Sequence, residues 1–445
     1  MRSALCSPAL LAALALAACG APADEEGSFA RVATTFLAGS GVATAATPAA
    51  AETPPAPPAP PAPRAPRDLA PPIIRGIYVN AYAMATPAHR ARLLALTDST
   101  EINTWVVDVK DDDGIRYASA LPLAQEVKHG SIPLKSLKAV VDTLTAHGIH
   151  PIARVVVFKD SRLALARPEW AIRTPSGGLW TDKVGNRWMS PWDERVWEHN
   201  IQIAEEAARA GFREIQFDYV RFPEAYRSLP RQVHAKARGE RAEAIAAFLT
   251  EAKRRLHPLG VTVTADVFGL SMNEARDVGI GQQWETLSAV VDGLLPMVYP
   301  SHYFPTHLPG IRSPNRMPYE TVFTSVGMGV LRNRRLQEAG HTPARVVPWI
   351  QAFSAPWVDR GYRYGPEQAS AQMKGVYDLG LEDWIFWNAG SRYDAIEPAL
   401  APKTERRGAH FQGTPLLTRM VDRFDREGAA AVREQLTAAD ISIAP

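Results

Sequence analysis

Short apolar runs that alternate with helical segments constrain the fold of this chain more than any other feature. The runs are rich in β-branched and aromatic residues, as buried strands are. We expect eight strands, at Ile73–Asn80, Thr104–Lys110, His150–Phe158, Ile215–Phe222, Val261–Phe268, Leu294–Pro300, Arg345–Phe353 and Asp383–Asn388. Helical patterns fall between several of them, at Pro87–Thr97, Leu134–His147, Val196–Ala210 and Arg241–Leu256. This alternation predicts the α/β class and a closed (β/α)8 TIM barrel over residues 72–401.

The fourth run shows the pattern most clearly. Gly211 ends the helix before it, and Ile215, Phe217 and Tyr219 then alternate with polar residues as in a strand. Pro223 should end the strand, because proline cannot donate to a sheet ladder. Asp218 is therefore expected near the carboxyl end of a buried strand, where β/α barrels build their active sites.

Polar groups also end several other runs. Asp266 ends the fifth run as Asp218 ends the fourth, and neighbouring strands lie about 5 Å apart. Two such carboxyls can reach the roughly 5–9.5 Å spacing of a glycosidase pair. We therefore predict Asp218 and Asp266 as catalytic residues. The side chains predicted to contact substrate are Asn80, Asp108, Lys110, Arg154, Trp188, Arg221, Tyr299, His302, Gln351 and Trp387.

Other interpretations of these residues stay open. Asp218 could be a structural acid paired with Arg221 or Arg154, and Asp266 could cap the helical turn that follows it. Glu224 could replace Asp266 as proton donor, or be an exposed loop residue. The predicted tryptophan contacts, taken singly, are more often core residues than sugar platforms.

Composition and motifs exclude several function classes. The net charge of +2, without a Lys/Arg-rich run, gives no case for nucleic acid. No glycine-rich dinucleotide fingerprint, phosphate loop, Gly-x-Ser-x-Gly elbow or His-Glu-x-x-His pair occurs. Asp111-Asp112-Asp113-Gly114 does not fit an EF-hand, because Val109 would fall on the first ligand position, so a solvated turn is expected. We expect neither a metal nor a cofactor.

The amino-terminal segment indicates export. Arg2 precedes a short apolar run, and Leu16-Ala17-Ala18-Cys19-Gly20 resembles the bacterial lipobox. This resemblance implies a signal peptide over residues 1–18, lipidation of Cys19 and an anchor in the cell envelope. Gly20 in place of Asp favours the outer membrane. An ordinary secretory signal is the alternative.

Low-complexity segments flank the predicted barrel. Residues 19–71 are rich in proline and alanine, and we expect a disordered tether. Residues 402–445 form a polar tail with one helix expected at Thr414–Leu436, outside the barrel.

Several motifs together resemble a bacterial family of glycoside-hydrolase-like β/α barrels long labelled a domain of unknown function. They are Arg75-Gly76-Ile77-Tyr78, Val107-Asp108-Val109-Lys110-Asp111, Gln216-Phe217-Asp218-Tyr219-Val220-Arg221-Phe222-Pro223, Thr264-Ala265-Asp266-Val267-Phe268-Gly269 and Met297-Val298-Tyr299-Pro300-Ser301-His302-Tyr303. The resemblance covers about Ile73 to Leu400 and implies a barrel related to amylase-like and chitinase-like hydrolases, acting on a polysaccharide.

By analogy with amylase-like barrels, the resemblance makes Asp218 the nucleophile and Asp266 the acid/base, although those barrels carry Glu at the second position. Alignment with the chitinase motif puts Val220 where that motif has its catalytic Glu, so chitinase chemistry of that form is not expected. A membrane-tethered glycoside hydrolase is therefore expected, and a non-catalytic carbohydrate-binding barrel is the alternative.

Overall fold

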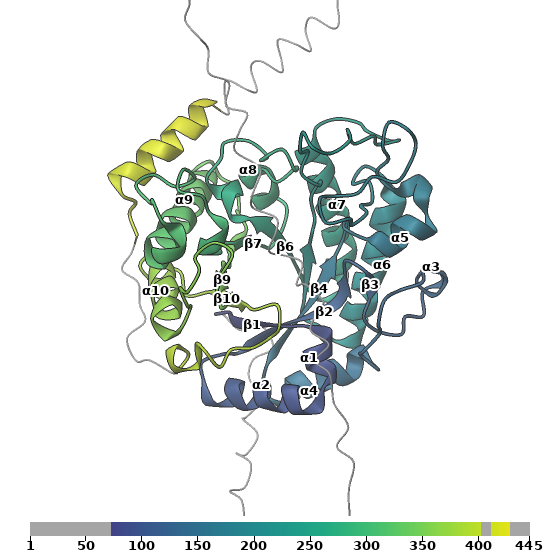
Figure 1. Ribbon diagram of the computed structural model, residues 1–445, viewed down its shortest axis with the longest axis horizontal. Helices are drawn as coiled ribbons and strands as arrows, with labels where there is room; N and C mark the ends of the chain where they lie inside the picture. The colour runs from purple at the N-terminus through teal and green to yellow at the C-terminus, as the bar shows by residue number, and fades with distance from the viewer. Residues whose placement is uncertain (1–72, 402–410, 428–445) are drawn as a thin grey trace, which may run out of the picture.

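The computed structural model describes residues 73–401 and 411–427 of the 445-residue chain. The expected signal peptide, Cys19 and the tether lie outside these residues. In the described part, ten strand segments form one sheet, and its order runs β1-β10-β9-β7-β6-β5-β4-β2 with a further pairing between β1 and β2. That pairing closes the sheet, and helices surround it (Figure 1). The predicted (β/α)8 barrel is confirmed.

The strand bounds follow the predicted apolar runs closely. They are β1 Arg75–Val79, β2 Thr104–Asp111, β3 Gly114–Ile115, β4 His150–Val156, β5 Glu214–Asp218, β6 Thr262–Phe268, β7 Gly293–Met297, β8 Arg345–Val346, β9 Trp349–Gln351 and β10 Trp384–Trp387. All neighbouring barrel strands are parallel, while β3 forms a short antiparallel hairpin with the end of β2. Pro348 separates β8 from β9, because it has no N–H to donate to the ladder, so the seventh run forms two segments.

Helices connect the strands around the outside. The α-helices are α1 Ala81–Ala85, α2 Pro87–Ser99, α3 Pro122–Glu126, α4 Leu137–Ala146, α5 Ser161–Ala166, α6 Glu194–Ala210, α7 Arg241–Leu256, α8 Trp284–Ser288, α9 Pro318–Glu338 and α10 Pro366–Tyr377. The 3-10 turns are η1 Pro168–Trp170, η2 His257–Leu259, η3 Gly269–Met272, η4 Pro300–His302, η5 Pro314–Arg316 and η6 Glu397–Ala399. Gly211 caps α6 at φ 108°, a conformation that side chains other than glycine rarely adopt, as its place in the sequence predicts.

Two apolar clusters form the core. One lies between the strands and the surrounding helices, and includes Ile215 and Phe217 of β5. The other contains Tyr78, Ile152 and Trp349 and fills the inside of the barrel. Side chains alternate along a strand, so the residues between the outward-facing ones, such as Gln216 and Asp218, project inward.

The fourth strand ends earlier than expected. β5 stops at Asp218, and Tyr219 has φ 47°, in the left-handed region. Tyr219 therefore does not continue the outward-facing row of Ile215 and Phe217, and the prediction of a strand that runs on to Pro223 is wrong. Positive φ at a bulky residue is uncommon and tends to occur at functional sites.

The described part of the tail packs outside the barrel. Residues 415–427 are helical and lie beside α9 (Figure 1). Leu417, Val421 and Phe424 are buried there, and Arg335 of α9 forms ion pairs with Asp422 and Asp425.

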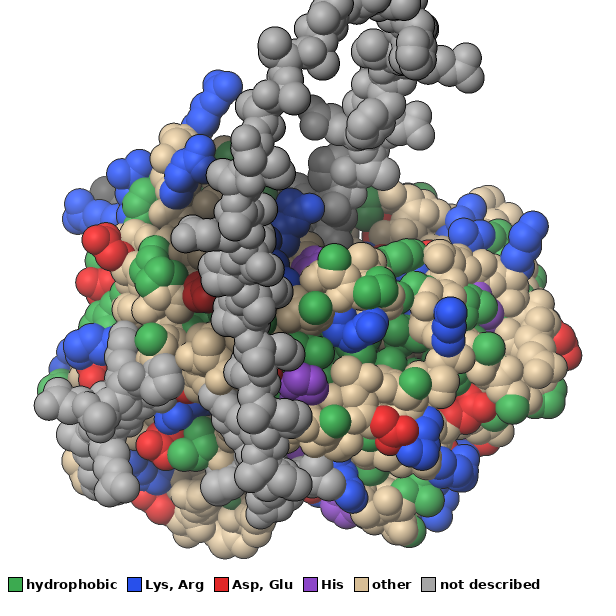
Figure 2. All heavy atoms as spheres, turned by 90° about the horizontal axis from the view of Figure 1, so that it is seen from below, with side chains coloured by type: hydrophobic (Ala, Val, Ile, Leu, Met, Phe, Trp, Pro, Cys, Tyr) green, Lys and Arg blue, Asp and Glu red, His purple; other side chains and the backbone are tan. Residues whose placement is uncertain are grey.

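Charges of both signs are interspersed over the outer surface. Figure 2 shows Lys and Arg next to Asp and Glu across the face that it presents, apart from the area under the grey atoms. In residues 73–401 and 411–427, no helix combines the length and apolar character needed to cross a membrane.

Candidate active site

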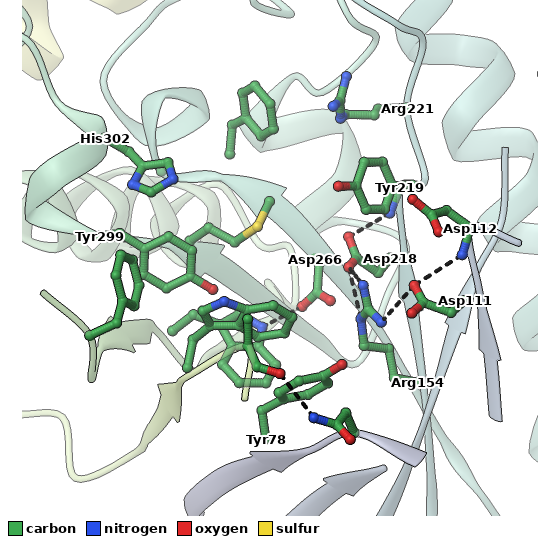
Figure 3. Close-up of a pocket in the computed structure, with 18 of the residues that line it drawn as sticks. Tyr78, Asp111, Asp112, Arg154, Asp218, Tyr219, Arg221, Asp266, Tyr299 and His302 are labelled. Atoms are coloured by element: carbon green, nitrogen blue, oxygen red, sulfur yellow. Dashed lines mark hydrogen bonds and ion pairs between the residues drawn. The ribbon is translucent and has the colours of Figure 1, made fainter. Parts of the chain in front are cut away.

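A pocket of about 330 Å³ lies at the carboxyl ends of the barrel strands. Carboxylates and arginines from β2, β4, β5 and the turns that follow β2 and β5 gather on one side of the pocket, which we call the charged side. Tyr299, His302 and other rings gather opposite, on the aromatic side (Figure 3). Asp266 of β6 stands between the two sides.

Arg154 of β4 clamps Asp218 on the charged side. Its Nε and Nη2 donate to Asp218 Oδ2 at 2.9 and 2.5 Å, and the backbone N–H of Tyr219 donates to Oδ1 at 2.5 Å. Asp218 thus pairs with Arg154, one of the two structural partners that the sequence left open, and still lines the pocket.

The same guanidinium also binds a deeper acid. Arg154 Nη1 donates to Asp108 Oδ1 at 2.6 Å, and the hydroxyl of Tyr78 donates to Asp108 Oδ2 at 2.5 Å. Burial raises the pKa of Asp108 to about 6, although the charge of Arg154 opposes the shift. One buried arginine on β4 therefore joins two carboxylates from β2 and β5, the strands on either side of it.

Asp266 has no cation as its direct partner. Its Oδ1 accepts hydrogen bonds from Gln216 Nε2 at 2.8 Å and Trp349 Nε1 at 2.6 Å. Burial and the nearby carboxylate of Asp218 raise the pKa of Asp266 well above its ordinary value. This shift favours the protonated form of the carboxyl. Its partners lie on the neighbouring strand β5 and on β9, and the following turn, η3, has no side-chain cap, so Asp266 does not cap it.

The acidic turn after β2 belongs to the pocket wall, so the expected solvated turn is wrong for two of its residues. Asp111 and Asp112 line the pocket. Asp111 Oδ2 lies 3.0 Å from Arg116 Nη2, and Asp112 Oδ2 lies 3.0 Å from Lys159 Nζ. The β2–β3 hairpin turns the chain back here and brings both carboxylates over the barrel mouth.

Packed rings make up the aromatic side. Trp387 stacks on Tyr78 with ring centroids 4.0 Å apart, and Tyr299 packs edge-on against His302 and Phe353. Burial lowers the pKa of His302 to about 4, so the imidazole is neutral at pH 7. A neutral imidazole can donate one hydrogen bond and accept another.

Most of the predicted site residues meet at this pocket. The wall contains both predicted acids and six of the predicted substrate contacts: Asn80, Arg154, Arg221, Tyr299, His302 and Trp387. Asp108 lies directly behind the wall, bound to Arg154.

Besides Asp108, three predicted contacts do not line the pocket, because their side chains are engaged elsewhere. Lys110 is fully buried, paired with Asp160 at 2.8 Å. The Trp188 indole donates to Asp182 at 3.0 Å, and Gln351 accepts from the backbone N–H of Ser301 and donates to Phe353 O. The structure thus gives these side chains roles in holding loops and strand ends.

Glu224 is occupied by Arg221. Its Oε2 lies 3.1 Å from Arg221 Nη1, and it does not line the pocket. The Arg221 guanidinium also lies over the rings of Trp188 and Phe268, 4.9 and 4.6 Å from their centroids. This geometry disfavours Glu224 as the proton donor.

Sequence reasoning missed Tyr78, Asp111, Asp112 and Trp349 as pocket residues. Tyr78 and Trp349 sit inside apolar runs and look like core residues, and only their closeness across the barrel reveals their polar contacts. Asp111 directly follows the second run, so a strand one residue longer would have indicated it. In the described residues, no group of three or more His, Cys, Asp or Glu could hold a metal ion.

Solved structures give the fold a context. The glycoside hydrolase domain of PgaB (BpsB) from Bordetella bronchiseptica matches with a TM-score of 0.54 and 14% identity, over 75% of this chain and 100% of that one. At this identity the likeness shows the fold alone. A hypothetical protein from Ruminiclostridium thermocellum is 35% identical over 43% of this chain and 97% of its own, with a TM-score of 0.40. The glycoside hydrolase domain of PelA from Pseudomonas aeruginosa gives 13% identity over 74% and 99%, with a TM-score of 0.41.

The sequence itself matches a described family. A comparison with curated proteins gives no significant match. Residues 76–393, which contain the whole pocket and all of the described strands except the first residue of β1, match the family described as "Putative glycosyl hydrolase domain". The chain therefore belongs to this glycosyl hydrolase family.

Proposed function

We propose that the pocket hydrolyses an O-glycosidic bond within a polysaccharide, with Asp266 as general acid and Asp218 as the stabilising or attacking carboxylate. The observation that carries the proposal is the contrast between the two acids. Asp266 is buried without a direct cation, and its pKa is raised well above the ordinary value, whereas Asp218 is ion-paired with Arg154. Glycosidases need such a division between a protonated acid and an ionised partner.

The steps follow from this division. Asp266 donates its proton to the glycosidic oxygen as the bond from that oxygen to the anomeric carbon breaks. Asp218 faces the positive charge that develops on the anomeric carbon, and stabilises it or bonds to it. Water then supplies a hydroxyl to the anomeric carbon, and its remaining proton returns to Asp266. Gln216 and Trp349 hold Asp266 Oδ1, which leaves Oδ2 as the oxygen that exchanges the proton.

The pocket's charges favour an uncharged sugar at the cleavage point. Both arginines that line the described pocket are already ion-paired, Arg154 with Asp108 and Asp218, and Arg221 with Glu224. A uronate or a sulfated sugar would bring an anion beside Asp111 and Asp112 without a cation to receive it. Pectin and alginate should therefore be poor substrates.

The alternative function is a non-catalytic carbohydrate-binding barrel, and the clamp of Arg154 on Asp218 is the observation in its favour. Both Asp218 oxygens accept hydrogen bonds, as in a structural ion pair. A binding site has no need, however, for a second acid whose pKa is raised in the same pocket.

The test is release of reducing ends by the full chain from cellulose, xylan, mannan, starch and glycol chitosan. Asp218→Asn and Asp266→Asn should each lower the rate on a cleaved polymer about 10²–10⁴-fold while the polymer still binds. Asp142→Asn, which changes an exposed acid paired with Lys138 on α4, is the control and should match the parent. Normal cleavage by both pocket variants would refute the site, and binding without cleavage would support the alternative.

We also propose that the barrel works outside the cytoplasm, attached through a lipid on Cys19. The support is the lipobox-like sequence alone. Metabolic labelling with an alkynyl fatty acid should mark the parent chain and not Cys19→Ser. Equal labelling of both chains would refute the anchor.

A further inference from the structure

Trp357 is the most exposed tryptophan in the described chain. It lies in the loop after β9, and 55% of its surface is exposed, while its neighbour Val358 is also exposed. The remaining tryptophans are buried or partly buried. Exposing an indole leaves a large apolar surface in water, so an exposed indole at a functional pocket calls for an explanation.

The indole continues the aromatic side of the pocket outward. It stacks on Phe353, with ring centroids 6.2 Å apart and planes 16° apart. Phe353 lines the pocket and packs against Tyr299 and His302. An unbroken series of rings therefore leads from the pocket interior to the solvent-exposed face of Trp357.

The loop that carries Trp357 is fixed on both sides of the indole. Asp359, two residues on, accepts hydrogen bonds from both Nε and Nη2 of Arg316 in η5. Tyr364 donates its hydroxyl to Asn315 O, and its backbone N–H donates to Ser354 Oγ at 3.0 Å. The exposed ring is thus held in place before any ligand arrives, which lowers the entropy lost on binding.

We propose that Trp357 is a sugar-binding platform outside the pocket, so that the protein takes a chain of sugars and not a single terminal residue. The proposal rests on the proposed function, since it adds a subsite to that cleft. The apolar face of a pyranose ring would stack on the indole, while its hydroxyls stay in water. The fixed geometry suits an extended, uncharged polysaccharide whose next sugars lie along Phe353.

The test compares chain lengths on whichever panel polymer the parent cleaves. For oligomers of two to eight sugars, kcat/KM of the parent should rise with length. Trp357→Ala should remove most of this rise, about tenfold on the longest oligomer, and change cleavage of the shortest one little. Trp357→Phe should restore part of the rise, and Trp357→Leu should not, because leucine is apolar but has no ring face.

Leu259→Ala is the matched control, since Leu259 is an exposed apolar residue in η2. It should reproduce the parent's length dependence. If Trp357→Ala also reproduces it, the platform is refuted while the hydrolase stands. If Trp357→Leu equals Trp357→Phe, stacking is refuted. If the parent neither cleaves nor binds any panel polymer, the proposed function fails, and the platform fails with it.

Discussion

The charged and aromatic sides of the pocket are held together by different forces. On the charged side, Arg154 alone neutralises Asp108 and Asp218, so no member of the trio is independent of the others. On the aromatic side, Tyr299, His302 and Phe353 pack as rings, and each contact is short-ranged. The two sides meet where the Arg154 guanidinium lies over the rings of Tyr78 and Trp387. We infer that damage to the charged side spreads to neighbouring charges, whereas damage to the aromatic side stays local.

The largest expected effect is that of Arg154→Met. The change leaves two buried carboxylates close together without their cation, which should lower the free energy of unfolding by about 3–5 kcal/mol. Urea denaturation measures the loss. Adding Asp108→Asn should recover part of it, because one of the unpaired charges is then gone. Arg209→Met is the control, since Arg209 forms an exposed pair with Glu205 on α6 and should cost less than about 1 kcal/mol. Equal losses in the two arginine variants would show that the buried Arg154 stabilises the fold no more than an exposed arginine does.

Trp387→Ala tests the aromatic side. It removes the ring that stacks on Tyr78 and should lower the free energy of unfolding by about 2–3 kcal/mol, less than in a closed core because the indole is partly exposed. KM for a cleaved polymer should rise about tenfold, because the ring binds substrate. The kcat should change little, because the substitution leaves Asp218 and Asp266 in place. Trp170→Ala, which removes a partly buried indole in η1 away from the pocket, should affect stability alone. A fall in kcat as large as the rise in KM would mean that the two sides are coupled.

The two sides should also respond to pH with opposite signs. His302 has a folded pKa of about 4, below the unfolded 6.5, so its contribution to stability is complete above pH 6.5 and lost as the pH falls towards 4. Asp108 has a folded pKa of about 6, above the unfolded 3.8, so its contribution is complete below pH 3.8 and lost as the pH rises through 6.

Urea midpoints at pH 7 and pH 5 separate the two contributions. When the pH falls from 7 to 5, His302 should lower the parent's free energy of unfolding by roughly 1–2 kcal/mol, and Asp108 should raise it by a similar amount. The first change should be absent in His302→Gln, and the second in Asp108→Asn. Only the change with pH is compared, so a constant loss of stability in either variant does not matter. Shifts of the same sign in both variants would contradict the contrast.

The smallest effect is expected from Trp188→Phe. Trp188 looked like a sugar contact in the sequence, but its indole donates to Asp182 and does not line the pocket. Loss of that hydrogen bond should cost about 1 kcal/mol and leave KM unchanged. A clear rise in KM would show that substrate reaches further than the pocket wall.

The fold was more predictable than the site. Period-2 runs and intervening helices specify the barrel, because burial of alternate side chains leaves a strong trace in the sequence. Tyr219 is an exception. The alternation of apolar and polar residues continues through it, but its backbone adopts a left-handed conformation. The period of apolar residues does not reveal a backbone turn at a single residue.

The site's charge balance depends on distances across the barrel. Asp218 and Asp266 could be predicted because each ends an apolar run. That Arg154 pairs with the first acid, and that Trp349 binds the second, depends on residues far apart in the sequence. The position of Lys110 also depends on a residue far away in the sequence, because it pairs with Asp160 and does not line the pocket.

The protonation of Asp266 is the point on which the proposed mechanism depends most directly. It can be measured without knowing the substrate, from the infrared difference spectrum between the parent chain and Asp266→Asn as the pH is varied. The raised pKa of Asp266 predicts a protonated carboxyl band that persists well above the pH at which an ordinary aspartate ionises. A carboxylate that ionises near the ordinary value of about 4 would contradict the assignment of Asp266 as general acid.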